Sequence, residues 1–189
     1  MCGRYVAEDD ESVDMGALYR ALHTAYPTVQ LKSGEILPTD TVPLICGREK
    51  TPMPGTWGFP GYNGKGLIIN ARVESVAEKV TFRDAFLWCR CIVPTTGYFE
   101  WSKQKQKFRF NLPGTRMVYL AGLYRSTPEG LRFVILTTAA NDSAARIHPR
   151  MPLILAGGMT DAWVADIGEA MACLRATMPG MVCNDQTLP

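Results

Sequence analysis

Six short apolar segments between residues 41 and 136 most constrain the fold of this chain. Each holds three to six residues rich in Val, Ile, Leu or aromatic side chains, and Gly, Pro or Asn separates it from the next. They are residues 41–45, 67–69, 91–93, 108–110, 117–120 and 131–136. Because short strands connected by turns pair with their neighbours, the pattern predicts an antiparallel sheet or a barrel.

Helical patterns precede, interrupt and follow these segments. Ser12 can cap a helix that runs to about Tyr26, where Pro27 stops it. Further helices are expected at residues 75–87, 142–147 and 160–176, the last with one apolar face. The fold class is therefore α+β, mainly antiparallel β with peripheral helices. No repeat, low-complexity tract or linker is visible, so we expect one domain over residues 1–189.

Composition argues against several classes of protein. Lys and Arg number 20 and Asp and Glu 18, so the net charge of +2 does not indicate binding to nucleic acid by bulk charge. No apolar run approaches the roughly 20 residues that cross a bilayer, and no secretory signal is visible. We therefore expect a cytoplasmic protein with no membrane partner. Its six cysteines should be thiols in that reducing compartment.

No metal site and no cofactor are expected. Cys89 and Cys91 are separated by one residue, whereas the cysteine ligands of structural zinc are usually separated by two to four. His23 and His148 are the only histidines. The spacing of these residues is therefore not that of a zinc site.

Cys2 carries the most suggestive chemistry. If Met1 is removed, Cys2 bears both a thiol and a free α-amine, and reference pKa values of about 8.5 and 8 leave both partly reactive near neutrality. Such an amine can form a Schiff base with an aldehyde, and the thiolate can close on the imine carbon to give a thiazolidine. An N-terminal nucleophile can equally perform hydrolysis with its own amine as base. A Cys at position 2 can also be a small residue without a catalytic role.

Glu100 and His148 are candidate groups for proton transfer. Glu100 lies between Phe99 and Trp101, and an apolar environment would raise its pKa towards general acid and base duty. The alternative is a carboxylate on the solvent-exposed face of a strand. His148 is a titratable group in a loop that prolines stiffen, although a single His in a loop is often only a hydrogen-bonded surface residue.

Two further patterns combine amide and basic groups. Asn70 and Arg72 stand at a strand end before Glu74, where the simpler interpretation is a turn with a surface ion pair. In residues 103–109 every second side chain is basic, which on a strand places four positive charges on one face. We favour an edge strand that its lysines protect from pairing. The alternative is a face that follows phosphates.

Five motifs in this order resemble the SRAP family, the SOS response-associated peptidases. One of them is fixed at the amino end, and together they extend over most of the chain. They are Cys2-Gly-Arg-Tyr5, Asn70-Ala-Arg72-x-Glu74, Gly97-Tyr-Phe-Glu-Trp101, Thr137-Thr-Ala-Ala-Asn141 and His148-Pro-Arg-Met-Pro152. The resemblance implies a barrel-like SRAP fold and a sensor of abasic sites in single-stranded DNA that crosslinks itself to the ring-opened sugar aldehyde.

The resemblance also assigns roles to the residues. It implies that Cys2 is the nucleophile, that Asn70 orients its amine, and that Glu100 moves protons during imine formation and ring closure. It implies that His148 is the acid that opens the deoxyribose and assists reversal of the crosslink. The positions implied to hold DNA are Arg4, Pro38, Arg72, Trp101, Thr137 and Arg150. The family is also credited with removing its own leading residues by autoproteolysis.

One segment departs from the family pattern. Relatives commonly carry a further Trp between the Trp-Gly pair and the Asn-Ala-Arg motif, whereas here Trp57-Gly58 is followed by a shorter segment without one. Phe59 and Tyr62 are the candidates to replace it as the aromatic side chain that contacts bases. On this resemblance the protein is a monomer of bacterial or phage type, cytoplasmic or associated with the nucleoid.

Two other functions remain open on sequence alone. One is a cysteine peptidase that uses Cys2 and His148 on other proteins, and the other is a non-covalent binder of single strands that uses the basic segment and Trp101. Charge by segment agrees with a nucleic-acid partner better than the total does. Residues 61–125 hold 11 basic and 4 acidic side chains, whereas both flanking segments have an acidic excess.

Overall fold

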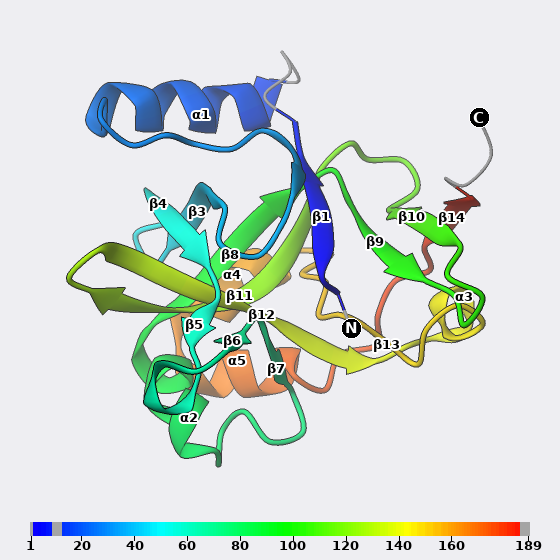
Figure 1. Cartoon of the computed structure of the whole chain (residues 1–189). Helices are drawn as coiled ribbons and strands as arrows, with labels where there is room; N and C mark the ends of the chain where they lie inside the picture. The colour runs from blue at the N-terminus through cyan, green and yellow to red at the C-terminus, as the bar shows by residue number, and fades with distance from the viewer. Residues whose placement is uncertain (1, 9–12, 186–189) are drawn as a thin grey trace.

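The structure, a computed structural model, describes residues 2–8 and 13–185. Within this part of the chain, five strands close into a β-barrel (Figure 1). They are β3 (Thr41–Cys46), β4 (Thr51–Trp57), β8 (Arg90–Thr95), β11 (Val118–Thr127) and β12 (Gly130–Ala139). The ring closes through β4 and β12, which run parallel, and the other barrel pairs are antiparallel. The predicted mainly antiparallel, barrel-like α+β fold is confirmed.

A second sheet lies beside the barrel (Figure 1). Its order is β14 (Val182–Asp185), β10 (Lys107–Asn111), β9 (Gly97–Trp101), β1 (Arg4–Ala7) and β2 (Gly34–Ile36). Tyr5, Tyr98 and Phe110 are aligned across its three central strands and are fully buried. The Tyr5 ring centroid lies 5.1 Å from that of Trp57 in β4. These aromatic contacts attach one face of the sheet to the barrel.

Four short strands complete the β-structure. They are β5 (Phe59–Pro60), β6 (Leu67–Ile68), β7 (Asn70–Arg72) and β13 (Arg150–Pro152). β5 and β6 pair with each other, while β7 and β13 flank β12 on its two sides. Thr137 of β12 is aligned with Arg72 on one side and with Pro152 on the other. Segments far apart in the sequence therefore meet at the end of β12.

Helices surround the barrel (Figure 1), and two of the predicted ones need correction. They are α1 (Val13–Ala25), α2 (Val80–Trp88), α3 (Asp142–Ala145), α4 (Met159–Ala165), α5 (Ile167–Cys173) and the short 3-10 helix η1 (Tyr62–Gly64). The helix expected from residue 75 begins only at Val80, and the one expected over residues 160–176 is divided at Asp166, whose extended backbone and side chain cap α5. The predicted cap Ser12 lies outside the described residues. None of the helices in the described ranges is long and apolar enough to span a membrane.

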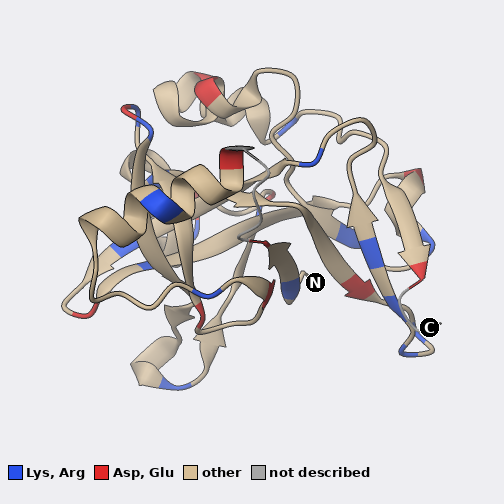
Figure 2. Ribbon diagram, turned by 90° about the horizontal axis from the view of Figure 1, so that it is seen from above, with Lys and Arg blue, Asp and Glu red and all other residues tan. Residues whose placement is uncertain are grey.

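The predicted basic edge strand is wrong. β10 begins at Lys107 and lies between β9 and β14, so it is an interior strand of its sheet. Lys103 and Lys105 belong to the preceding turn, where Lys105 has a positive φ of 65°. The basic residues of segment 61–125 are distributed over β7, α2, β8, β10, β11 and the loops between elements. Figure 2 accordingly shows Lys and Arg spread over many elements and mixed with Asp and Glu.

Candidate active site

Cys2 lies directly before β1 and is fully buried. Its main-chain oxygen accepts a hydrogen bond of 2.8 Å from Asn70 Nδ2 at the start of β7. Its Sγ donates to the main-chain oxygen of Arg4 at 3.7 Å. Burial raises the pKa of the Cys2 thiol, so the thiol keeps its proton until a base accepts it. Asn70 thus fixes the backbone of Cys2 relative to the end of β12.

Glu100 lies near Cys2, and His148 lies near Glu100. Glu100, on β9, is only 4% exposed, and burial raises its pKa. Its charge acts on the Cys2 thiol, whose pKa it raises further. His148 Nδ1 lies 3.9 Å from Glu100 Oε1, and it lies 3.1 Å from both the main-chain nitrogen and the main-chain oxygen of Arg150. The interpretation of Glu100 as a surface carboxylate is therefore wrong.

Arg150 is held by acceptors of this protein. Its two terminal nitrogens contact both carboxylate oxygens of Glu74, and Nη2 also donates to the main-chain oxygen of Thr137. The hydrogen bond from Arg150 lowers the pKa of Glu74. Thr137 is fully buried, and its hydroxyl donates to the Ala71 oxygen at 3.5 Å. Arg72, by contrast, is exposed and makes no ion pair with any described residue.

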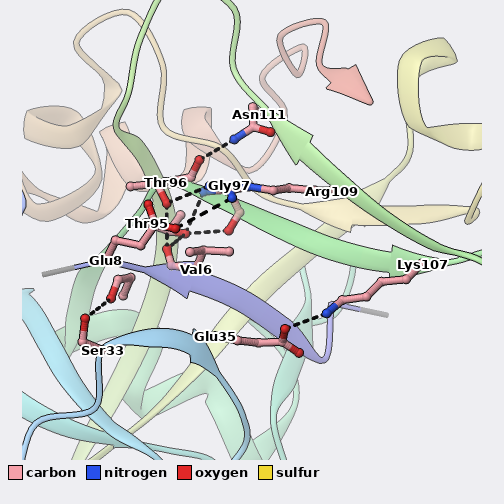
Figure 3. A network of polar contacts seen from close by, with 11 residues as sticks. Val6, Glu8, Ser33, Glu35, Thr95, Thr96, Gly97, Lys107, Arg109 and Asn111 are labelled. Carbon is pink, nitrogen blue, oxygen red and sulfur yellow. Dashed lines mark hydrogen bonds and ion pairs between the residues drawn. The ribbon is translucent and has the colours of Figure 1, made fainter. Parts of the chain in front are cut away.

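The outward face of the second sheet combines cations and aromatic rings. Glu35 of β2 bonds Arg4 Nη1 at 2.5 Å and Lys107 Nζ at 2.6 Å, and Figure 3 shows the contact with Lys107. The Arg4 guanidinium lies over the Trp101 ring at 5.3 Å, and Lys107 Nζ lies 4.0 Å from the centre of the Phe99 ring. We call Arg4, Glu35, Phe99, Trp101 and Lys107 the sheet platform.

A polar network fixes β1 against β9 (Figure 3). Thr95 Oγ1 donates to the Val6 oxygen at 2.6 Å and accepts a hydrogen bond of 3.1 Å from the Gly97 N–H. A Cβ atom at Gly97 would lie 2.6 Å from the Phe110 oxygen, so glycine is needed for the close approach of β9 and β10. The strands that carry Cys2 and Glu100 are therefore held in a defined register.

Most of the predicted site residues lie together, but sequence reasoning missed some of their neighbours. Pro38 lies in the turn after β2, and no hydrogen bond within the described ranges links it to the other predicted site residues. Glu35 was missed, and the sequence holds no local signal for it. Tyr98 was also missed although it stands in the motif with Glu100. Its buried hydroxyl has no hydrogen-bond partner among the described residues, and burial raises its pKa.

Comparison with known protein families now decides the family. The model of the family described as "SOS response associated peptidase (SRAP)" matches residues 1–182. The chain belongs to the SRAP family. All five motifs quoted from the sequence lie inside the matched range. The structure places the other four near the Cys2 motif and the end of β12.

Curated relatives carry names that refer to DNA damage. The SRAP chain is 37% identical over 106 residues to the abasic site processing protein YoqW of Bacillus subtilis, a match that covers 51% of this chain and 47% of YoqW. It is 29% identical over 177 residues to the abasic site processing protein YedK of Escherichia coli, which covers 87% of this chain and 79% of YedK. The match thus spans about half the length of YoqW.

Solved structures share the fold. A protein from Bacteroides thetaiotaomicron superposes with a TM-score of 0.78 at 21% identity, over 97% of this chain and 91% of that one. A protein from Bordetella bronchiseptica superposes with a TM-score of 0.76 at 20% identity, over 99% of this chain and 100% of that one. At this identity the comparison concerns the fold alone.

Proposed function

We propose that this protein processes abasic sites in single-stranded DNA and joins itself to them covalently through Cys2 after Met1 has been removed. The single observation that carries the proposal is the position of Cys2. Asn70 holds its main chain, and the buried Glu100 lies beside it with His148 3.9 Å from that carboxylate. An amine, a thiol, a carboxyl group and an imidazole together can perform every proton transfer that condensation with an aldehyde requires.

The amine acts first in the proposed reaction, because the thiol keeps its proton in this buried site. The amine nitrogen attacks the aldehyde carbon of the ring-opened sugar, and loss of water gives an imine. The Cys2 sulfur then bonds to the imine carbon, and the thiol proton passes to the imine nitrogen. One water molecule is released overall, and the product is a thiazolidine.

Glu100 is the proton carrier in these steps. Because its pKa is raised, the carboxyl group can both give and take a proton at a pH closer to neutrality than an exposed glutamate can. His148, whose Nδ1 lies 3.9 Å from Glu100 Oε1, is the acid for opening the deoxyribose ring and for reversing the crosslink. The same Cys2 nucleophile accounts for autoproteolytic release of leading residues.

In the proposed complex, the DNA strand lies along the surfaces next to Cys2. Arg72 is an exposed cation ready for a phosphate, and the sheet platform offers Trp101 and Arg4. Of the two candidates for the missing Trp, Phe59 is buried, whereas Tyr62 is 87% exposed at η1, so we assign base stacking to Tyr62. Pro38 and Arg150 shape the surface around these groups, and the main-chain oxygen of the buried Thr137 accepts a hydrogen bond from Arg150.

The test is a crosslinking assay. Protein whose intact mass shows the loss of Met1 is incubated with a single strand that carries one abasic site, and adducts are counted on a denaturing gel. Cys2→Ala should abolish the adduct. Cys183→Ala, which removes a different thiol that is partly exposed, should leave the adduct yield unchanged. An adduct of equal yield from Cys2→Ala would overturn the mechanism.

A further inference from the structure

A cavity of about 400 Å³ lies apart from the Cys2 site. It opens between the turn after β3, the end of α2 and the junction of α4 and α5. Its lining includes Arg48, Leu87, Trp88, Arg90 and Ile167. None of these residues contacts the groups around Cys2 through any hydrogen bond or ion pair of the described residues. The cavity is large enough for one large side chain and a polar group.

Arg90 gives this cavity a buried positive charge. It is 7% exposed, and its Nε donates to the Trp163 oxygen at 2.7 Å. Its Nη1 donates to the main-chain oxygens of Phe86 and Leu87 at 2.7 and 2.8 Å. Among the described residues nothing bonds Nη2, and no carboxylate forms an ion pair with this guanidinium. A buried cation held only by carbonyl groups favours an anion at its remaining nitrogen.

The walls of the cavity are fixed by other contacts. The Gly47 N–H donates to the Arg90 oxygen at 3.2 Å, which joins the β3–β4 turn to β8. Lys50 of the same turn pairs with Asp161 of α4. Trp163 Nε1 donates to the Cys91 oxygen at 2.9 Å and so anchors α4 on the barrel. These contacts join β3, β8 and α4 around the cavity and so hold its walls in place.

The rim of the cavity is apolar and exposed. Trp88, the last residue of α2, is 80% exposed, and Ile167 at the start of α5 is 38% exposed. A large aromatic ring and an aliphatic side chain in solvent beside a cavity are typical of an interaction site. Asp166 also lines the cavity, but its Oδ1 accepts the Glu169 N–H as the cap of α5. The lining thus contains two arginines, Arg48 and Arg90, and one carboxylate.

We propose that this cavity binds the carboxyl terminus of a partner protein whose last residue is large and apolar. The terminal carboxylate contacts Arg90 Nη2 and Arg48, and the apolar side chain packs against Leu87, Trp88 and Ile167. A nucleic acid fits less well, because Arg48 and Arg90 are the only cations of the cavity lining among the described residues, whereas Leu87, Trp88 and Ile167 offer an apolar surface.

The test uses the full chain and fluorescent octapeptides that differ only at their carboxyl end. Peptides that end in Phe, Leu or Trp with a free carboxylate are titrated by anisotropy, beside the same peptides with a terminal amide and one that ends in Ser. At least one apolar acid should bind with a Kd in the micromolar range, and amidation or Ser should weaken it tenfold or more. Equal binding of acid and amide, or no binding of any of the three apolar acids, would overturn the proposal.

Variants locate the binding. Trp88→Ala and Arg48→Ala change exposed side chains and should each weaken the peptide at least fivefold, while Arg83→Ala, an exposed arginine of the same helix α2, should not. Arg90→Lys, with its fold checked by circular dichroism, should also weaken it. A single-stranded 20-mer serves as the other arm. If Trp88→Ala weakened that DNA while no peptide bound, the site would be one for nucleic acid. Crosslinking at Cys2 is scored separately, so either proposal can fail alone.

Discussion

Replacing Glu35 by Gln should strengthen the binding of undamaged single-stranded DNA. In the free protein the Glu35 carboxylate contacts Arg4 at 2.5 Å and Lys107 at 2.6 Å, so it occupies the two cations of the sheet platform that phosphates would use. The Glu35 side chain is 33% exposed, and each such partly exposed pair contributes about 0.2–1 kcal/mol. In the wild-type protein, DNA must break both pairs, which weakens its binding by about 0.4–2 kcal/mol. Glu35→Gln should therefore lower Kd about 2- to 30-fold.

The assay is fluorescence anisotropy with an undamaged 20-mer over a series of salt concentrations. If both freed cations gain phosphates, the slope of log Kd against log salt should steepen by about 1.4. Glu78→Gln is the matched control, because it removes the same charge from an exposed side chain that makes no ion pair with any described residue. Unchanged or weaker binding by Glu35→Gln would refute the reasoning and would mean that Glu35 positions Arg4 for DNA instead.

The pH dependence of this difference follows from the pKa of Glu35. Partial burial acts to raise it, but hydrogen bonds from Lys107 and Arg4 outweigh burial and lower the pKa below its ordinary value of 4.5. Glu35 is therefore charged throughout the neutral range, and the advantage of the Gln variant should persist from pH 8 down to about pH 5. It should disappear only as the pH falls through the lowered pKa.

Four further outcomes are expected. Glu100→Gln should slow crosslinking about 10²- to 10⁴-fold near neutral pH and remove a rate-controlling ionisation whose pKa lies above 4.5, measured from initial rates on denaturing gels. Asn70→Ala should slow crosslinking about 2- to 12-fold, the equivalent of a hydrogen bond of about 0.5–1.5 kcal/mol, and should lower Tm by about 1–6 °C. His148→Ala should slow release of the adduct more than its formation; faster release would contradict its role. Glu74→Gln should lower Tm by about 1–4 °C at pH 7, because the lowered pKa of Glu74 stabilises the fold above pH 4.5, and the difference should vanish as the pH falls through that pKa.

The barrel could be predicted because its strands are locally apolar and bounded by turn residues, but one strand gave no such signal. β4 contains Pro52 and Pro54, residues that argue against a strand, yet it joins β3 to β12 and closes the ring. Its parallel pairing with β12 links residues more than 70 positions apart, and no local pattern encodes that. The break at Asp166 did carry a signal, since Asp166 followed by Glu169 is typical of a helix start.

An apolar environment for Glu100 was one of two interpretations of the sequence, and it was argued from the wrong neighbours. Phe99 and Trp101 point to the opposite face of β9, because adjacent residues of a strand alternate, and both lie beside Lys107 on the sheet platform. Glu100 is buried because its own face, with Tyr98, is turned towards the barrel and Cys2. The carboxyl environment therefore depends on how the second sheet packs on the barrel, which the local sequence does not contain.

The same non-local packing decides which basic residues can meet DNA. Of the arginines expected to hold phosphates, Arg4 pairs with Glu35 and Arg150 with Glu74, and within the described ranges Arg72 makes no ion pair. Two of these three arginines are thus already paired with carboxylates of this protein before DNA arrives. A strand of DNA must displace two carboxylates to use those arginines, so the acids of this surface control affinity as strongly as its cations.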